Sequence, residues 1–126
     1  MKKSDFSKSV YVALLGIAHG ISKERNIKIQ VLIGIFIIVL SYFLQINRLE
    51  FIMILLVIFL VLSFELANTA MEKLIDRLHP GYDAEYGRVK DIMAGAVLLM
   101  VLLSILVGLL ILFNPLLNVV LSHLPQ

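Results

Sequence analysis

Four oxygen-bearing side chains recur along one short segment at intervals of three, four and four residues: Glu65, Asn68, Glu72 and Asp76. In an α-helix such intervals stack the side chains on one face. Glu65 directly follows fourteen uncharged residues, 51–64, so we expect it inside a membrane or at its edge. A carboxylate there is costly and marks a functional site by default. The competing interpretation, a solvated helix end whose acids pair with Lys73 and Arg77, explains Glu65 poorly.

Two further polar clusters stand just before long apolar runs. The first is Glu24-Arg25-Asn26, and the second contains Arg88, Lys90 and Asp91. Taken alone, each is explained by ordinary polarity at a membrane interface. All three clusters should lie at one depth, however, where a helical bundle can bring them together. Carboxylates suit Mg²⁺, lysine binds phosphate as a point charge, and phosphoryl transfer needs little more than a metal, positive charge and a positioned base.

Other chemistries find no support in the sequence. Cysteine is absent, which excludes disulfides, thiolate metal sites and cysteine nucleophiles. The three histidines, His19, His79 and His123, show no metal-ligand spacing. Neither the P-loop pattern nor Gly-x-Gly-x-x-Gly occurs, so any ATP site must be built differently. The net charge of +2 is too small to suggest a nucleic-acid partner.

The elements that must position these residues are membrane helices. Hydrophobic residues make up 60% of the 126-residue chain and charged residues only 16%, whereas soluble domains are about half apolar and a quarter charged. Crossing the hydrocarbon core takes about 20 apolar residues. We predict a single all-α membrane domain over 1–126, with transmembrane helices at 27–46, 51–78 and 89–113, the last two extending into the cytoplasm.

The segments outside the spans have their own patterns. Residues 1–23 carry apolar side chains at helical spacing among lysines, which predicts an amphipathic helix on the membrane surface. A signal peptide is the competing interpretation, because Lys2 and Lys3 precede a short apolar stretch. We expect a break after His79, where proline and glycine follow, and a second break at Asn114-Pro115 that leaves 114–126 as an outer tail.

Basic residues predict the orientation of the chain. They gather before or at the start of the first span and again between the second and third spans: Lys2, Lys3, Lys8, Lys23, Arg25, Lys28, Lys73, Arg77, Arg88 and Lys90. The turn between the first two spans has one, Arg48, and the tail after Phe113 has none. Positive charge is retained in the cytoplasm. We therefore expect a cytoplasmic N-terminus and an external C-terminus.

Three blocks of the sequence resemble a known family. The string Glu65-Leu66-Ala67-Asn68-Thr69-Ala70-Met71-Glu72-Lys73-Leu74-Ile75-Asp76 is similar to the signature Glu-x-x-Asn-[Ser/Thr]-Ala-x-Glu-x-x-x-Asp of the prokaryotic diacylglycerol kinases, which include undecaprenol kinases. Residues 87–98 resemble the second family signature, built around Ala-Lys-Asp. Glu24-Arg25-Asn26 resembles the Glu-Arg-Asn of the undecaprenol kinase branch. The likeness covers roughly residues 6–113.

The resemblance implies a bacterial cytoplasmic-membrane homotrimer whose active sites are shared between subunits and use ATP and Mg²⁺. The general base of the family falls on Glu65, and its metal-binding glutamates fall on Glu24 and Glu72. Its nucleotide-contacting pair falls on Lys90 and Asp91. The remaining family positions, those of the nucleotide loop and of supporting polar groups, are Gly81, Tyr82, Asp83, Asn68, Asp76 and Arg88.

We therefore expect an ATP-dependent kinase that phosphorylates the hydroxyl of a membrane lipid, either undecaprenol or diacylglycerol. Both lipids present a primary hydroxyl at the interface, so the chemistry does not separate them. A non-catalytic membrane bundle that retains the fold is the main alternative. A cation carrier is disfavoured because carriers place polar residues deep in several spans, whereas the third span has only Ser104.

Overall fold

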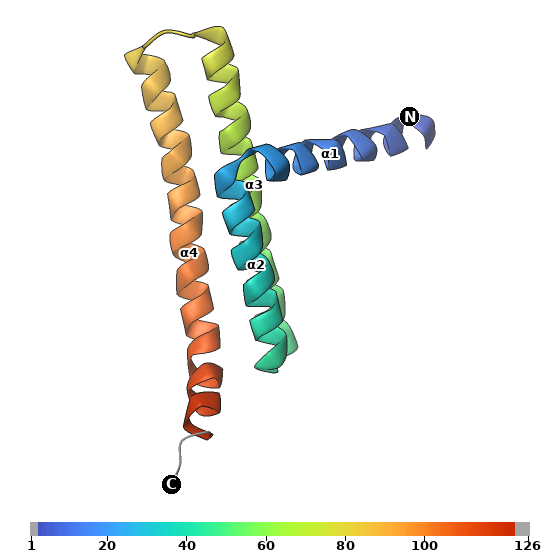
Figure 1. The fold of residues 1–126 in the computed structure, drawn as a ribbon, viewed down its shortest axis with the longest axis vertical. Helices are drawn as coiled ribbons and strands as arrows, with labels where there is room; N and C mark the ends of the chain where they lie inside the picture. The colour runs from blue at the N-terminus through green and yellow to red at the C-terminus, as the bar shows by residue number, and fades with distance from the viewer. Residues whose placement is uncertain (1–2, 123–126) are drawn as a thin grey trace.

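The described part of the protein is built from four α-helices joined by short turns. The computed structural model describes residues 3–122, and these form α1 (Lys3–Lys23), α2 (Arg25–Phe43), α3 (Arg48–Leu78) and α4 (Ala84–Ser122). The helices α2, α3 and α4 lie alongside one another, and α1 projects nearly at right angles to them (Figure 1). Within the described residues there is no β-strand. The prediction of an all-α fold is confirmed.

Three of the helices are long and apolar enough to cross a membrane. They contain 19, 31 and 39 residues, which at about 1.5 Å per residue gives lengths of about 28, 46 and 58 Å. The hydrocarbon core is about 30 Å thick, so α3 and α4 are longer than the membrane requires. Their connected ends extend past the level of α1 (Figure 1). The chain is a multi-pass membrane protein with two helices that project beyond the bilayer.

Side-chain burial fits a lipid environment. The small core of buried apolar side chains centres on Ile54, Ile111 and Leu112, at the α2–α3 turn end of the bundle. Most other large apolar residues of α2 and α4 are exposed, including Leu32, Phe36 and Leu110. In water such a surface would be unstable, whereas acyl chains solvate it.

The turn between α2 and α3 is closed by two local motifs. After α2, Gln45 adopts a left-handed conformation with φ 52°, and the Ile46 amide donates to the Ser41 carbonyl at 3.5 Å. Glycine is the usual residue at such a position. At the start of α3, the Asn47 side chain accepts from the Glu50 amide, and the Glu50 carboxylate accepts from the Asn47 amide, both at 3.0 Å. This capping box fixes where α3 begins, three residues before the predicted Phe51.

A single residue separates α1 from α2. Glu24 has φ −99° and ψ 123°, an extended conformation that turns the chain from the surface helix into the first span. The corner packs tightly on α3, because a Cβ on Gly20 would lie 2.5 Å from Leu66 Cδ2. A side chain at this position would force Leu66 to shift, so the glycine lets the end of α1 approach α3 closely.

The predicted break at Asn114-Pro115 is wrong, since α4 continues through Pro115 to Ser122. Proline lacks an amide hydrogen and clashes with the carbonyl four residues earlier, here that of Ile111. Membrane helices tolerate such a residue because local adjustments and neighbouring helices satisfy the freed group. Residues 116–121, apolar except for Asn118, continue the helix, and residues 123–126 of the expected tail lie outside the described residues. At its other end, α4 begins at Ala84, five residues before the predicted start.

Candidate active site

The polar face of α3 descends from solvent into the membrane. Glu65 and Asn68 are buried, with 5% and 7% of their surface exposed. Glu72 is partly buried and Asp76 is exposed. The Asn68 side-chain amide donates to a Glu72 carboxylate oxygen at 3.0 Å, so these two residues share one face as the spacing predicts. A carboxylate and an amide are therefore held inside the apolar part of the helix bundle.

Glu65 has a partner that the sequence interpretation missed. The Gln30 side-chain amide of α2 donates to a Glu65 carboxylate oxygen at 3.2 Å, and the other polar atom of this amide, Gln30 Oε1, is buried without a hydrogen-bond partner. Gln30 lies near the start of the first apolar run, where a polar residue is easily interpreted as a mere edge of the span. A glutamine in a membrane helix needs a partner, and that rule was the available signal.

The corner residue Glu24 is tied to the same end of α3. Its carboxylate forms an ion pair with the Lys73 ammonium, with the two charged atoms 2.6 Å apart. Since Lys73 directly follows Glu72, the pair brings the start of α2 to the level of the Asn68–Glu72 hydrogen bond. The two glutamates on which the family's metal ligands fall are thus placed at one end of the bundle, Glu24 at the corner before α2 and Glu72 on α3.

The basic residues of α4 divide between the site and the surface. Lys90 forms an ion pair with Asp76, which joins α4 to α3. Arg88 instead pairs with Glu85 on its own helix and is exposed. Asp91 is also exposed and forms no ion pair within the described residues. Within one chain, Lys90 therefore meets the acidic face of α3, whereas Arg88 and Asp91 do not.

The loop between α3 and α4 borders a hollow of about 130 Å³ whose lining includes Asp76 and Lys90. Asp83 caps α4, because its carboxylate accepts from the amides of Glu85 at 2.8 Å and Tyr86 at 3.2 Å. Gly81 lines the hollow.

Aromatic rings lie in and beside this loop. Tyr86 stacks on His79 with ring centroids 4.0 Å apart. Tyr82 is 98% exposed and so is free to contact a ligand outside the loop.

The oxygen atoms of Glu24, Glu72 and Asn68 are of the kind that Mg²⁺ prefers. Among residues 3–122 no group of three or more His, Asp or Glu side chains is close enough to hold a metal alone. Magnesium, however, keeps several waters and takes one or two carboxylates with substrate phosphates. Glu24 and Glu72 supply these, and the buried Asn68 Oδ1 has no hydrogen-bond partner and is a further hard oxygen. In donor chemistry these residues would suit a magnesium ion that is held together with phosphate oxygens.

Comparison with known proteins matches this chain to one family of prokaryotic lipid kinases. The sequence profile described as "Prokaryotic diacylglycerol kinase" matches residues 11–112. A diacylglycerol kinase from Synechocystis sp. is 31% identical over 107 residues, which cover 84% of this chain and 61% of the relative. An undecaprenol kinase from Bacillus subtilis is 30% identical over 106 residues, which cover 84% of this chain and 86% of the relative. The match thus spans less than two thirds of the first relative and most of the second.

Proposed function

The chain belongs to the prokaryotic diacylglycerol kinase family, and we propose that it transfers the terminal phosphate of ATP to the hydroxyl of a membrane lipid, undecaprenol or diacylglycerol. One observation carries the proposal: α3 holds a buried carboxylate, Glu65, at the membrane end of its polar face. The other polar side chains of that face, Asn68, Glu72 and Asp76, follow at helical spacing and lead to solvent. A lipid hydroxyl can approach from the membrane side, and a nucleotide can approach from the solvent side. Glu65 lies where the two would meet.

Glu65 is suited to act as the general base. Its carboxylate would accept the proton of the lipid hydroxyl as the bond from the lipid oxygen to the γ-phosphorus forms and the bond to the β–γ bridging oxygen breaks. A positioned base of this kind contributes about 10²–10⁴-fold to rate. The hydrogen bond from Gln30 at 3.2 Å holds one carboxylate oxygen and leaves the other for the substrate.

Other residues would bind and orient the nucleotide. Bound Mg²⁺ supplies neutralisation of the phosphate charge, and Glu24 and Glu72 would hold it with Asn68 as a further ligand. Glu24 would then exchange its ion pair with Lys73 for the metal. Lys90 would contact the phosphates, because its ammonium lies beside Asp76 at the solvent end of the polar face of α3.

We also propose a homotrimer with shared active sites and a cytoplasmic N-terminus. The resemblance to the family supports the trimer. The position of Asp91 supports the sharing, because this residue does not meet the acidic face of its own chain. The concentration of basic residues around α1, the start of α2 and the α3–α4 loop supports the orientation.

The test is phosphate transfer from radiolabelled ATP by the purified protein in detergent with Mg²⁺. Undecaprenol and diacylglycerol would be supplied separately and in competition, with Glu72→Gln as the blank. We expect transfer to at least one lipid and loss of transfer in the blank. If neither lipid is phosphorylated and ATP does not raise the melting temperature, the protein is a non-catalytic bundle that retains the fold.

A further inference from the structure

The first span has one apolar face that the other helices leave uncovered. Leu32, Ile35 and Val39 of α2 are exposed, and they follow one another at intervals of three and four residues. Such intervals place the three side chains on one side of a helix. Because α2 is long and apolar enough to cross a membrane, this side of the helix is suited to contact with acyl chains.

Two basic residues stand on the same face, at the end where α2 meets α1. Lys28 precedes Leu32 by four residues and Arg25 precedes Lys28 by three, so both share the side of the apolar residues. Both are exposed, and within the part of the chain that the structure describes neither forms an ion pair or a side-chain hydrogen bond. The adjacent acid, Glu24, is already paired with Lys73. Two uncompensated positive charges therefore lie one turn from an apolar face.

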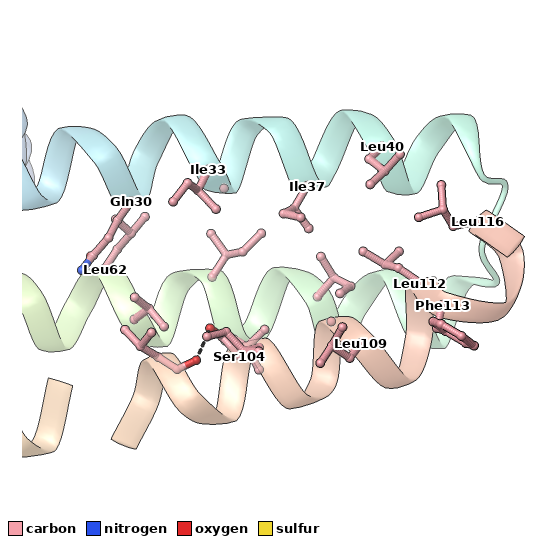
Figure 2. Close-up of a pocket in the computed structure, with 18 residues that line it drawn as sticks. Gln30, Ile33, Ile37, Leu40, Leu62, Ser104, Leu109, Leu112, Phe113 and Leu116 are labelled. Atoms are coloured by element: carbon pink, nitrogen blue, oxygen red, sulfur yellow. Dashed lines mark hydrogen bonds between the residues drawn. The ribbon is translucent and has the colours of Figure 1, made fainter. Parts of the chain in front are cut away.

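This face is separate from the candidate active site. On the other side of α2, Gln30 donates its hydrogen bond to Glu65 and lines a hollow of about 440 Å³ between the three spans (Figure 2). Gln30 follows Lys28 by two residues, which is a rotation of about 200° around the helix axis. A molecule that contacts Lys28 and Leu32 from the lipid side therefore does not lie at Glu65.

We propose that this face of α2, formed by Arg25, Lys28, Leu32, Ile35 and Val39, binds an anionic phospholipid. The lipid phosphate pairs with the two cations, and an acyl chain lies along the three apolar side chains. From Lys28 to Val39 the face is about 16 Å long, close to the half of the hydrocarbon core, about 15 Å, that one leaflet fills. The proposal does not depend on the phosphate transfer proposed above.

Charge and shape together favour this occupant. An anionic headgroup at a membrane surface gains about fivefold in affinity for each Lys or Arg that it meets, and a guanidinium pairs with phosphate through two parallel hydrogen bonds. A zwitterionic phospholipid carries an ammonium group that the same cations repel. A free phosphate ion would leave the apolar face without a partner. A second copy of the chain would have to bury both cations or pair them with its own acids, whereas a lipid phosphate stays at the interface.

Tryptophan fluorescence tests the site locally, because the chain contains no tryptophan. Leu32→Trp places a reporter in the proposed site. Leu102→Trp places one at an exposed position of α4, twelve residues after Lys90, the last Lys or Arg of the chain. Each full-length protein is reconstituted in vesicles that mix phosphatidylglycerol with phosphatidylcholine, one of the two being brominated so that it quenches the reporter. The measured quantity is the affinity for phosphatidylglycerol relative to phosphatidylcholine at each reporter.

The expected ratios follow from the number of cations. At Leu32→Trp phosphatidylglycerol should bind about 5- to 30-fold more strongly than phosphatidylcholine, the range for one or two cations. Adding Arg25→Gln and Lys28→Gln should bring the ratio close to one. Adding Arg48→Gln and Arg77→Gln, which remove the same charge at exposed positions outside the face, should leave the ratio unchanged. Arg25→Lys combined with Lys28→Arg retains both charges and should retain the preference.

Salt gives a second measurement that needs no further substitution, should the Gln variants fail to fold. At about 1 M KCl charges are screened beyond about 3 Å, so the preference at Leu32→Trp should fall. Inorganic phosphate, added at constant ionic strength, should not compete, because it makes no contact with the apolar face.

Four results would overturn the proposal. Equal affinity for the two lipids at Leu32→Trp would show that the cations do not recognise the headgroup. The same preference at Leu102→Trp, or its retention after Arg25→Gln and Lys28→Gln, would show a general attraction to the protein instead of a site. Competition by inorganic phosphate would show an anion site without the acyl contact. If neither brominated lipid quenches Leu32→Trp, a second copy of the chain covers the face.

Discussion

The hydrogen bond between Gln30 and Glu65 should matter for the chemical step more than for substrate binding. Gln30→Leu keeps a side chain of similar size but removes the donor that lies 3.2 Å from the carboxylate. A hydrogen bond to a charged group contributes about 1.5–3 kcal/mol. If this stabilisation orients the Glu65 carboxylate for proton transfer, its loss should lower kcat by about 10- to 150-fold, at about 1.4 kcal/mol per factor of ten.

The assay separates a positioning role from a general loss of stability. Initial rates would be measured at saturating lipid while ATP is varied, and KM for ATP should stay near the wild-type value because Gln30 lies on the membrane side of the polar face. Gln45→Leu makes the same substitution at an exposed glutamine in the α2–α3 turn. It should leave kcat unchanged. A Gln30→Leu protein that melts like the wild type and retains its kcat would refute the role of this hydrogen bond.

Three further predictions concern the fold and are checked by thermal melting of the detergent-solubilised protein. Gln45→Gly should stabilise by about 1 kcal/mol by relieving the left-handed strain, and an unchanged melting temperature would contradict that strain. Asn47→Ala should destabilise by about 1 kcal/mol because it removes the acceptor for the Glu50 amide; retained stability would show that the cap is dispensable. Gly20→Leu should destabilise by about 1–3 kcal/mol because its side chain would overlap Leu66, 2.5 Å from the new Cβ, whereas Gly16→Leu, at an open position on the same helix, should not.

The elements that local sequence determines could be predicted. Long uncharged runs give the three spans, because their length matches the thickness of the hydrocarbon core. The intervals between Glu65, Asn68 and Glu72 place these residues on one face of α3, because they match the helical period. The hydrogen bond from Asn68 to Glu72 follows directly from that spacing.

The missed features depend on contacts between helices or on competing local rules. The partner of Glu65 is Gln30, thirty-five residues earlier, and no periodicity relates the two. Pro115 was predicted to end α4 by a rule that holds in water, where a broken helix end is solvated; in a membrane, continuing the helix costs less than exposing backbone groups to lipid. Asp83 matches an N-cap pattern and caps α4, a role that the sequence interpretation missed, while its contact with a nucleotide stays a prediction.

The proposed role of Glu65 as the base is tested by the single-turnover rate of phosphate transfer by Glu65→Gln. Glutamine keeps the size of the side chain and its capacity for a hydrogen bond with Gln30, but it cannot accept the proton. We predict that the rate falls by about 10²–10⁴-fold while ATP still raises the melting temperature as it does for the wild type. A Glu65→Gln protein that transfers phosphate at the wild-type rate would show that Glu65 is not the base.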